Sequence, residues 1–282
     1  MTDSKNIFIW KNFTEWKPVL EKMFPDILTD EFIDKIKQNK NLIKYHDDPI
    51  FDELANKEMD SIVTYKKIVE FRRHYSHIRM YHGCRPVDVQ RYYREGIKPC
   101  EEMGNIQIDR FREIFLSDDF PELTEEMLQE SIKIINNPPP DTGVHFIIDD
   151  NCMIERCGHY LIYGSEYLQG LVNNLPVKDK EKYRSVLRGI GKPTFLEVNL
   201  PNTNDFVEDI RIFKILDRML RLWVYNIAHN GTTSGDFYYG TVIMKELQPE
   251  YICSDYHPKK IKDSLMGNKY YNTETGEYTE SK

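Results

Sequence analysis

The hydrophobic pattern changes near residue 76, and this change limits most strongly what the chain can fold into. Up to that point apolar residues recur about every 3.6 positions, which predicts helices over 14–23, 29–36 and 52–75. Beyond it, residues 78–82 alternate apolar and polar side chains as a strand does. The sequence therefore predicts an α+β fold, with a helical segment over 1–75, a mixed domain over 76–265 and a polar, flexible tail over 266–282.

Turn and cap residues divide the mixed domain into further elements. We expect strands over 144–148, 160–163, 193–201 and 237–247, and helices over 86–95, 124–135, 178–187 and 205–229. Gly96 ends the first of these helices, and the pair Asn230-Gly231 ends the last. In the longest helix Leu216, Met219 and Leu220 fall at helical spacing, which indicates a packed core face rather than a partner-binding surface.

Composition narrows the classes of protein. The 46 acidic residues outnumber the 38 basic ones, which gives a formal net charge of −8 and an isoelectric point near 5.6. Such a chain is not expected to bind nucleic acid over its whole surface, although a local basic groove is compatible with it. No apolar run approaches the roughly 20 residues that cross a bilayer, and residues 1–13 lack the pattern of an export signal. The five cysteines form no CxxC pair, which favours the cytoplasm over a disulfide framework.

The sharpest local signal is the segment YHGCR over 81–85, at the end of an expected strand. A histidine beside a glycine can offer one ligand both a side-chain donor and an uncovered backbone. Small-molecule sites combine a few such fixed polar groups with apolar walls. The alternative is that His82 and Gly83 belong to an ordinary strand-to-helix turn.

The segments YHGCR and YYREGIKP resemble the first strand and helix of ADP-ribosyltransferases of the diphtheria-toxin and poly(ADP-ribose) polymerase kind. Further resembling segments follow in the order of that family: TGVHF at 142–146, CGHYLIYGSEYL at 157–168, PTFLEVNLP at 193–201 and GDFYYGTVIMKELQPEYI at 235–252. The resemblance implies a split mixed β-sheet with flanking helices that binds NAD in a cleft. It also implies transfer of ADP-ribose from NAD to a macromolecular acceptor, with release of nicotinamide.

The resemblance also implies roles for individual residues. His82 would hydrogen-bond a ribose of NAD, and the backbone of Gly83 would bind the nicotinamide carboxamide. Tyr160, or failing that Tyr163, would stack on the nicotinamide ring, because an electron-rich face complements a cationic pyridinium. Arg85 and His145 are the further expected NAD contacts; His145 stands where the family has tyrosine, and Cys84 where it has serine or threonine.

A carboxylate near the last strands would stabilise the cationic sugar that forms as nicotinamide leaves. Asp236 fits best by position, Glu166 is the second candidate and Glu197 the third. Each could instead be an ordinary solvated surface charge.

Two other chemistries involve the cysteines. A thiol nucleophile at Cys84 beside His82 is conceivable, since both lie on one face of a strand, but no third group orients them. Cys152, Cys157 and His159, with His145, could approach a zinc ion, but their spacing lacks the two tight pairs of structural sites. We therefore expect no metal.

Basic residues suggest partners. The run formed by Arg72, Arg73, His74, His77 and Arg79 could bind the NAD pyrophosphate or an RNA or DNA acceptor; alternatively it is the solvated end of a helix. Microbial members of the family are often toxins or phage-defence effectors, which would add an antitoxin or regulatory partner.

Two further functions stay open. One is an RNA 2′-phosphotransferase of the same fold, with Arg79, Arg85 and Arg188 around the phosphate. The other is a non-catalytic binding module that keeps an NAD-like pocket.

Overall fold

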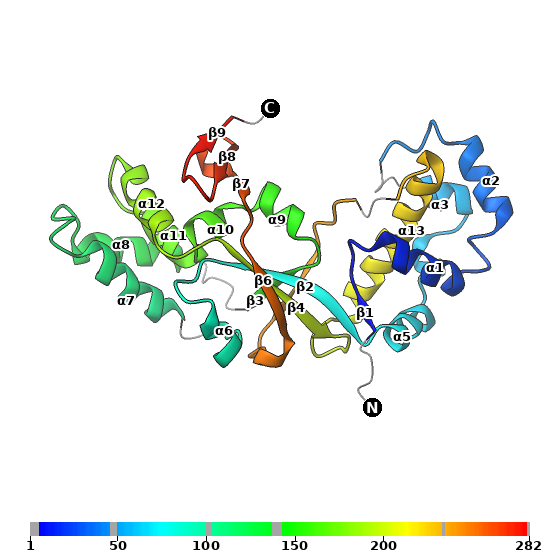
Figure 1. Ribbon diagram of the computed structural model, residues 1–282, viewed down its shortest axis with the longest axis horizontal. Helices are drawn as coiled ribbons and strands as arrows, with labels where there is room; N and C mark the ends of the chain where they lie inside the picture. Colours follow the sequence, from blue (N-terminus) through cyan, green and yellow to red (C-terminus); the bar gives the residue numbers. More distant parts are fainter. Residues whose placement is uncertain (1–5, 46–49, 100–102, 137–142, 233–234, 281–282) are drawn as a thin grey trace. The chain divides into compact units, whose positions relative to one another are not determined.

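The computed structural model describes residues 6–45, 50–99, 103–136, 143–232 and 235–280 (Figure 1). The chain divides into two compact units: unit 1 comprises Met1–Met80 and Asn199–Thr241, and unit 2 comprises Tyr81–Val198 and Val242–Lys282. Helices and largely antiparallel strands confirm the α+β class. The division differs from the expected one, because the long helix after residue 205 joins the N-terminal segment instead of the mixed domain.

Unit 1 is built mainly from helices around α13 (Asp209–His229). The others are α1 (Phe13–Met23), α2 (Asp30–Gln38), α3 (Ile50–Ala55), α4 (Met59–Ile62) and α5 (Tyr65–His74), and the short β1 (Ile7–Phe8) pairs in parallel with the start of β2 (His77–Cys84). The single helix expected over 52–75 is wrong. Asn56, at φ 51°, adopts the left-handed conformation just after α3, so the chain turns there although no glycine or proline is present.

The apolar stripe of α13 is buried, as the sequence predicts, and it forms the centre of unit 1. Leu216, Met219, Leu220 and Trp223 are completely buried, and the Trp223 ring stacks on Phe32 of α2 with centroids 6.4 Å apart. The helix ends at Asn230, which takes the left-handed conformation of a C-cap.

In the part of the chain that the structure describes, the main sheet has six strands: β5-β3-β2-β4-β6 lie in this order with β2 central, and β1 also pairs with β2. Its other strands are β3 (Val144–Ile147), β4 (Thr194–Pro201), β5 (Gly240–Ile243) and β6 (Ile252–Tyr256), with β2–β3 and β4–β6 antiparallel. A short 3₁₀ helix, η1 (Pro249–Tyr251), leads into β6. The strands expected near 78–82, 144–148 and 193–201 are confirmed, and the one expected over 237–247 is shorter.

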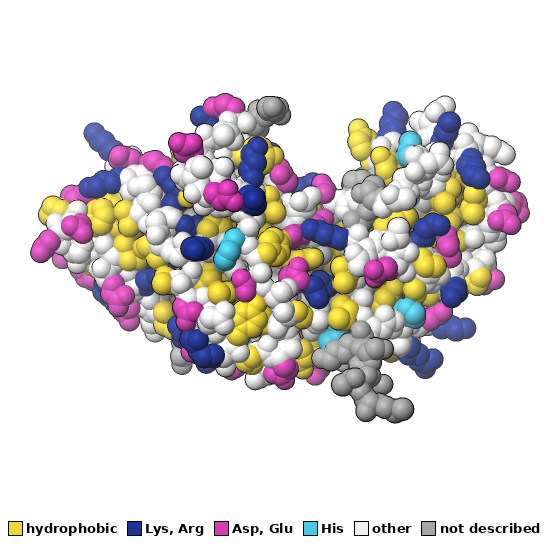
Figure 2. All heavy atoms as spheres, viewed as in Figure 1, with side chains coloured by type: hydrophobic (Ala, Val, Ile, Leu, Met, Phe, Trp, Pro, Cys, Tyr) yellow, Lys and Arg dark blue, Asp and Glu magenta, His cyan; other side chains and the backbone are white. Residues whose placement is uncertain are grey.

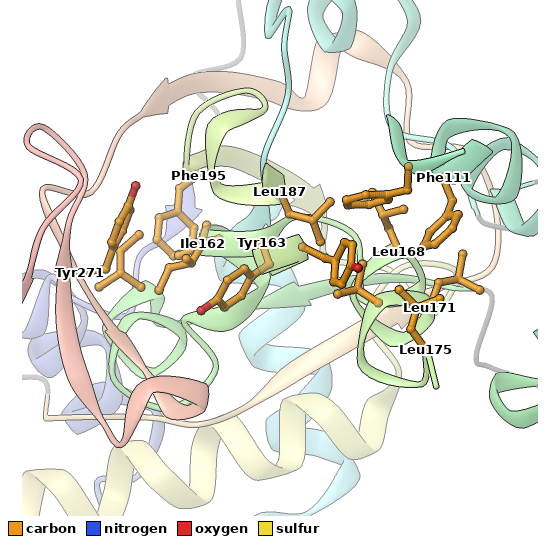
Figure 3. Close-up of a cluster of buried hydrophobic side chains, with 14 of the residues drawn as sticks. Phe111, Ile162, Tyr163, Leu168, Leu171, Leu175, Leu187, Phe195 and Tyr271 are labelled. Carbon is orange, nitrogen blue, oxygen red and sulfur yellow. The ribbon is translucent and has the colours of Figure 1, made fainter. Parts of the chain in front are cut away.

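Seven helices of unit 2 lie within the described residues: α6 (Gln90–Glu95), α7 (Met103–Phe115), α8 (Glu125–Ile135), α9 (Asp150–Arg156), α10 (His159–Tyr163), α11 (Glu166–Asn173) and α12 (Lys180–Gly189). Helices α7, α8 and α12 pack around α11 (Figure 1). Figure 3 shows the apolar core running from Tyr271 past Ile162 and Tyr163 to Phe111 on α7.

The strand expected over 160–163 is wrong, because these residues form α10. A short apolar run fits a buried helix as well as a strand, and here three consecutive side chains, Leu161, Ile162 and Tyr163, are buried. Gly158 precedes the helix, and Gly164 ends it at φ 87°. A Cβ at Gly158 would lie 2.2 Å from the carbonyl oxygen of Lys262, so the close contact with the following chain requires glycine.

The C-terminal residues are not the flexible tail that their polarity predicts. They form an antiparallel sheet of β7 (Lys260–Asp263), β8 (Lys269–Asn272) and β9 (Tyr278–Thr279), with η2 (Ser264–Met266) between the first two strands. Ile261 and Tyr271 bury their side chains in the core of unit 2, and this burial orders the segment. No helix in the described parts of the chain is long and apolar enough to span a membrane.

Candidate functional site

His82 lies near the C-terminal end of the central strand β2. Its Nδ1 lies 3.0 Å from the carbonyl oxygen of His145 on β3. Because a carbonyl can only accept, Nδ1 carries the proton, and Nε2 of the neutral ring is an acceptor. Burial lowers the pKa of His82, and the bond to the carbonyl only partly opposes this. His82 is therefore a neutral imidazole at pH 7, and its Nε2 can accept a hydrogen bond from a hydroxyl group.

Gly83 lies close to side chains of α9 and α10. A Cβ at this position would lie 2.2 Å from Sδ of Met153 on α9 and 3.2 Å from Cδ2 of Leu161 on α10. Both distances are too short for an unshifted side chain. The segment around Gly83 is thus in direct contact with α9 and α10.

Arg85 joins the end of β2 to two helices. Its Nε donates to the carbonyl oxygen of Ile190 at 2.8 Å, its Nη1 to that of Leu161 at 3.2 Å, and its Nη2 to that of Arg188. Burial lowers the pKa of the guanidinium, and the Tyr271 hydroxyl opposes this shift. Cations favour the carbonyl-bearing ends of helices, so Arg85 holds the C-terminal ends of α10 and α12 in place. The guanidinium of Arg85, which the resemblance assigns to NAD, thus donates to backbone carbonyl oxygens of the protein itself.

Tyr160 and Glu166 lie together at the junction of α10 and α11. The half-buried Tyr160 donates from its hydroxyl to Oε1 of Glu166 at 3.2 Å, and its ring centroid is 4.1 Å from that of His159. Glu166 is exposed in the first turn of α11, where a negative charge is favourable. Ser165 caps that helix by accepting from the backbone N–H of Leu168 at 3.5 Å.

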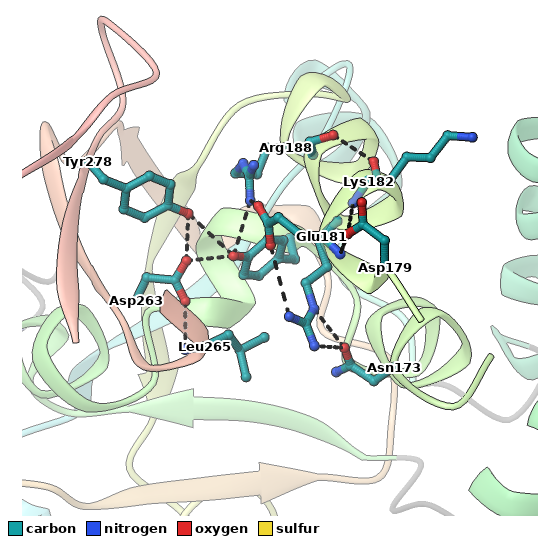
Figure 4. A network of polar contacts seen from close by, with 11 residues as sticks. Asn173, Asp179, Glu181, Lys182, Arg188, Asp263, Leu265 and Tyr278 are labelled. Carbon is teal, nitrogen blue, oxygen red and sulfur yellow. Dashed lines mark hydrogen bonds and ion pairs between the residues drawn. The ribbon is translucent and has the colours of Figure 1, made fainter. Parts of the chain in front are cut away.

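Tyr163 is buried, and its hydroxyl takes part in a polar network inside unit 2. Its hydroxyl and that of Tyr278 each lie 2.6 Å from the same oxygen of the completely buried Asp263, to which both donate (Figure 4). Arg188 Nη1 donates to the Tyr163 hydroxyl at 3.3 Å, and the Leu265 N–H donates to the other Asp263 oxygen at 2.9 Å. Burial raises the pKa of both tyrosines, so they stay protonated. Of the two expected stacking residues, only Tyr160 therefore has a partly exposed ring.

The other two expected acids, Asp236 and Glu197, have surroundings of their own. Asp236 is exposed in unit 1, where its carbonyl oxygen accepts from Arg218 Nη2 at 2.7 Å. Glu197 lies half-buried on β4 and accepts from the Ser254 hydroxyl at 2.7 Å. Glu166 contacts an expected NAD-binding residue, because it accepts the hydrogen bond from the Tyr160 hydroxyl.

The cysteine chemistry gains no support. Cys84 is buried, its Sγ lies 3.6 Å from the carbonyl oxygen of Thr194, and burial raises the pKa of its thiol to about 12. A protonated thiol is a poor nucleophile. Cys152 is buried too, and no group of three or more His, Cys, Asp or Glu side chains within the described residues is arranged to hold a metal. Cys100 and Thr142 lie outside the described residues.

The side chains of the basic run over 72–79 have different surroundings in the fold. Arg72 reaches the segment before α13, binding Asp209 Oδ1 at 2.8 Å, Asn202 and Asn204. Arg79 donates to Asn199 at 2.8 Å. These two arginines stabilise unit 1 internally, while Arg73 and His74 stay exposed.

The residues that sequence reasoning missed are Asp263, at the end of the expected mixed domain, and Tyr271 and Tyr278, in the segment over 266–282 that was expected to be flexible. The sequence did hold a signal for strands in this segment. Ile261 and Asp263 are two positions apart and would share one face of a short strand, and the two tyrosines at 270–271 follow. Comparison with models of protein families, with curated proteins and with solved structures finds no match.

Proposed function

We propose that unit 2 cleaves NAD and transfers its ADP-ribose to a macromolecular acceptor, with release of nicotinamide. The proposal combines the sequence resemblance with the neutral His82, the glycine beside it and the tyrosine–glutamate pair at 160 and 166.

One observation carries the proposal. Leu161 contacts Gly83 through its side chain and Arg85 through its carbonyl oxygen, although 76 residues separate Arg85 from Leu161 in the sequence. The segment that resembles the histidine-bearing strand end is thereby in contact with the helix that carries Tyr160. This contact between two segments far apart in the sequence supports the proposal.

Each residue then has a defined task. Nε2 of His82 accepts a hydrogen bond from a ribose hydroxyl, and the ring of Tyr160 stacks on nicotinamide. The bond between ribose C1′ and the nicotinamide nitrogen breaks, and its electron pair leaves with neutral nicotinamide. The carboxylate of Glu166 stabilises the cationic sugar, and an acceptor oxygen or nitrogen then bonds to C1′ and loses its proton to solvent.

We assign the acid to Glu166 rather than to Asp236. Glu166 belongs to the same unit as His82 and Tyr160, and its hydrogen bond to the Tyr160 hydroxyl keeps it beside the proposed nicotinamide site.

The experiment is a measurement of nicotinamide release from NAD by the purified chain. We expect Glu166→Gln to lower the rate about 100- to 1000-fold, as does loss of one transition-state charge contact. Tyr160→Ala should raise KM, whereas Tyr160→Phe should keep most binding because the ring remains. Glu130→Gln, an exposed acid on α8 of the same unit, is the matched control and should release nicotinamide at the wild-type rate.

Two outcomes would change the account. If Asp236→Ala abolishes release while Glu166→Gln does not, the acid is Asp236. If the wild type binds NAD but releases no nicotinamide with protein or RNA added, the chain is a binding module. The RNA 2′-phosphotransferase gains no support, because Arg85 and Arg188 are adjacent but donate to carbonyl, phenol and carboxylate oxygens of the protein.

A further inference from the structure

A surface of unit 1 combines cations with aromatic rings, and nothing in the proposed NAD chemistry uses it. We call it the basic–aromatic patch. It consists of Arg211, Lys214 and Arg218 on α13 and of Phe237, Tyr238 and Tyr239 in the segment after that helix. We infer that this patch binds single-stranded nucleic acid.

The cations share one face of α13, because their positions are three and seven residues apart. Each contacts an aromatic ring. The guanidinium carbon of Arg211 lies 5.3 Å and the Nζ of Lys214 5.2 Å from the Tyr239 ring centroid, and the guanidinium carbon of Arg218 lies 5.8 Å from that of Phe237. The patch therefore offers positive charge directly beside flat apolar surfaces.

The rings belong to a stack that begins in the core. Trp16 stacks on Trp10 at 5.7 Å, Trp10 contacts Phe237 at 4.7 Å, and Phe237 lies parallel to Tyr239 at 5.3 Å and 10°. The stack ends at the half-buried Tyr239. Beside it, Tyr238 is 57% exposed.

Hydrogen bonds fix the segment that carries these rings. Trp10 Nε1 donates to the carbonyl oxygen of Gly235 at 3.0 Å, and Arg218 Nη2 donates to that of Asp236 at 2.7 Å. Arg211 Nη1 donates to the Tyr239 hydroxyl at 3.3 Å. The rings are thus held in position before any ligand arrives, which reduces the entropy lost on binding.

Charge and shape together select the ligand. Proteins that bind single strands pair backbone phosphates with Lys and Arg, and stack unpaired bases on aromatic side chains. The carboxylates of an acidic peptide would satisfy the cations, but they supply no flat rings to stack on Tyr238 and Tyr239. Acids also border the patch: Glu208 has an oxygen 3.7 Å from Arg211 Nε, Asp217 interacts electrostatically with Arg218, and Asp236 is exposed, so the contact is local. On the face drawn in Figure 2, Lys, Arg, Asp and Glu side chains are likewise interspersed.

The test is fluorescence anisotropy of a short labelled oligo(U) strand with the full chain. Three cations predict that the logarithm of the binding constant falls with the logarithm of salt concentration at a slope of about −2. Tyr238→Ala and Lys214→Glu should each weaken binding about tenfold, because both side chains are exposed and contribute stacking or charge.

Matched controls lie in the same unit. Tyr65, which is 69% exposed at the start of α5, and Lys66, which is exposed on the same helix, give the control variants Tyr65→Ala and Lys66→Glu. Both should bind like the wild type, and circular dichroism should show all four variants folded. No binding of the wild type at low salt would overturn the inference, as would equal losses in the controls. Preference for a duplex or an acidic peptide over oligo(U) would also contradict it. The result is independent of NAD cleavage, because every patch residue belongs to unit 1.

Discussion

The two units use polar side chains differently. Unit 1 keeps its ion pairs at the margin of an apolar and aromatic core: in the Arg72–Asp209 pair the side chains are 16% and 32% exposed. Unit 2 completely buries the Asp263 side chain and surrounds it with two tyrosine hydroxyls and a backbone N–H. Both units join distant segments through polar contacts, but those of unit 2 include a completely buried carboxylate, whereas the Arg72–Asp209 pair of unit 1 stays partly exposed.

The difference bears on the proposed site. Tyr163 and Tyr160 are on the same short helix, and Asp263 attaches that helix to the C-terminal sheet. Arg85 connects the same helix to the end of β2, because its Nη1 donates to the carbonyl oxygen of Leu161. The position of the proposed stacking residue thus depends on a buried polar network, and polar networks lose much of their stability when one member is removed.

The largest expected effect is that of Asp263→Ala. It leaves the buried Tyr163 hydroxyl and two partly buried donors, Tyr278 O–H and Leu265 N–H, without their acceptor, so the free energy of unfolding should fall by about 3 kcal/mol. Asp263→Asn keeps one acceptor oxygen and should recover part of the loss. Urea denaturation measures both, and a loss below about 1 kcal/mol for the alanine variant would show that the network contributes little.

A backbone contact of unit 2 gives the next effect. Gly96 has φ 75°, and a Cβ there would lie 2.1 Å from the carbonyl oxygen of Leu247, which pairs with Ile97. Gly96→Ala should cost about 3 kcal/mol, because the strain and the clash add. Gly189→Ala is the control: nothing lies within 4 Å of its added Cβ, so it should be neutral or stabilise by about 0.5 kcal/mol. Equal melting temperatures for the two variants would refute this reasoning.

The corresponding change in unit 1 should be smaller. Asp209→Ala removes the carboxylate that faces Arg72, but Arg72 keeps Asn202, Asn204 and the carbonyl oxygen of Val207 as acceptors. We expect a loss of about 1 kcal/mol in chemical denaturation, as for other partly exposed pairs. A loss as large as that of Asp263→Ala would remove the contrast between the units.

The smallest effect concerns pH. Because burial lowers the pKa of His82 below 6.5, the unfolded chain takes up a proton at this site before the folded chain does. This contribution to stability is present above about pH 6.5 and is lost as the pH falls through the folded-state pKa. Imidazole NMR should give a His82 midpoint below 6.5, and a midpoint above that value would exclude the neutral ring that we assign at pH 7.

The contrast also explains what the sequence can predict. The periodic apolar stripe of α13 identifies its helix and buried face, because local spacing alone decides them. The helix α10 and the C-terminal sheet escape prediction, because Gly158 must approach Lys262 and Tyr163 must meet Asp263, contacts about 100 residues apart. For the site, the sequence identifies His82, Tyr160 and Glu166 as candidates. Only the fold separates Tyr160 from the buried Tyr163 and Glu166 from Asp236 in unit 1.

The central claim is that unit 2 cleaves NAD, and release of nicotinamide tests it most directly. The wild type and Glu166→Gln are incubated with NAD alone, with bulk cell protein and with single-stranded RNA, and free nicotinamide is quantified by chromatography. The account predicts release by the wild type, faster with one of the two additives, and a loss of about 100-fold or more in the variant. No release by the wild type under any of the three conditions would contradict it.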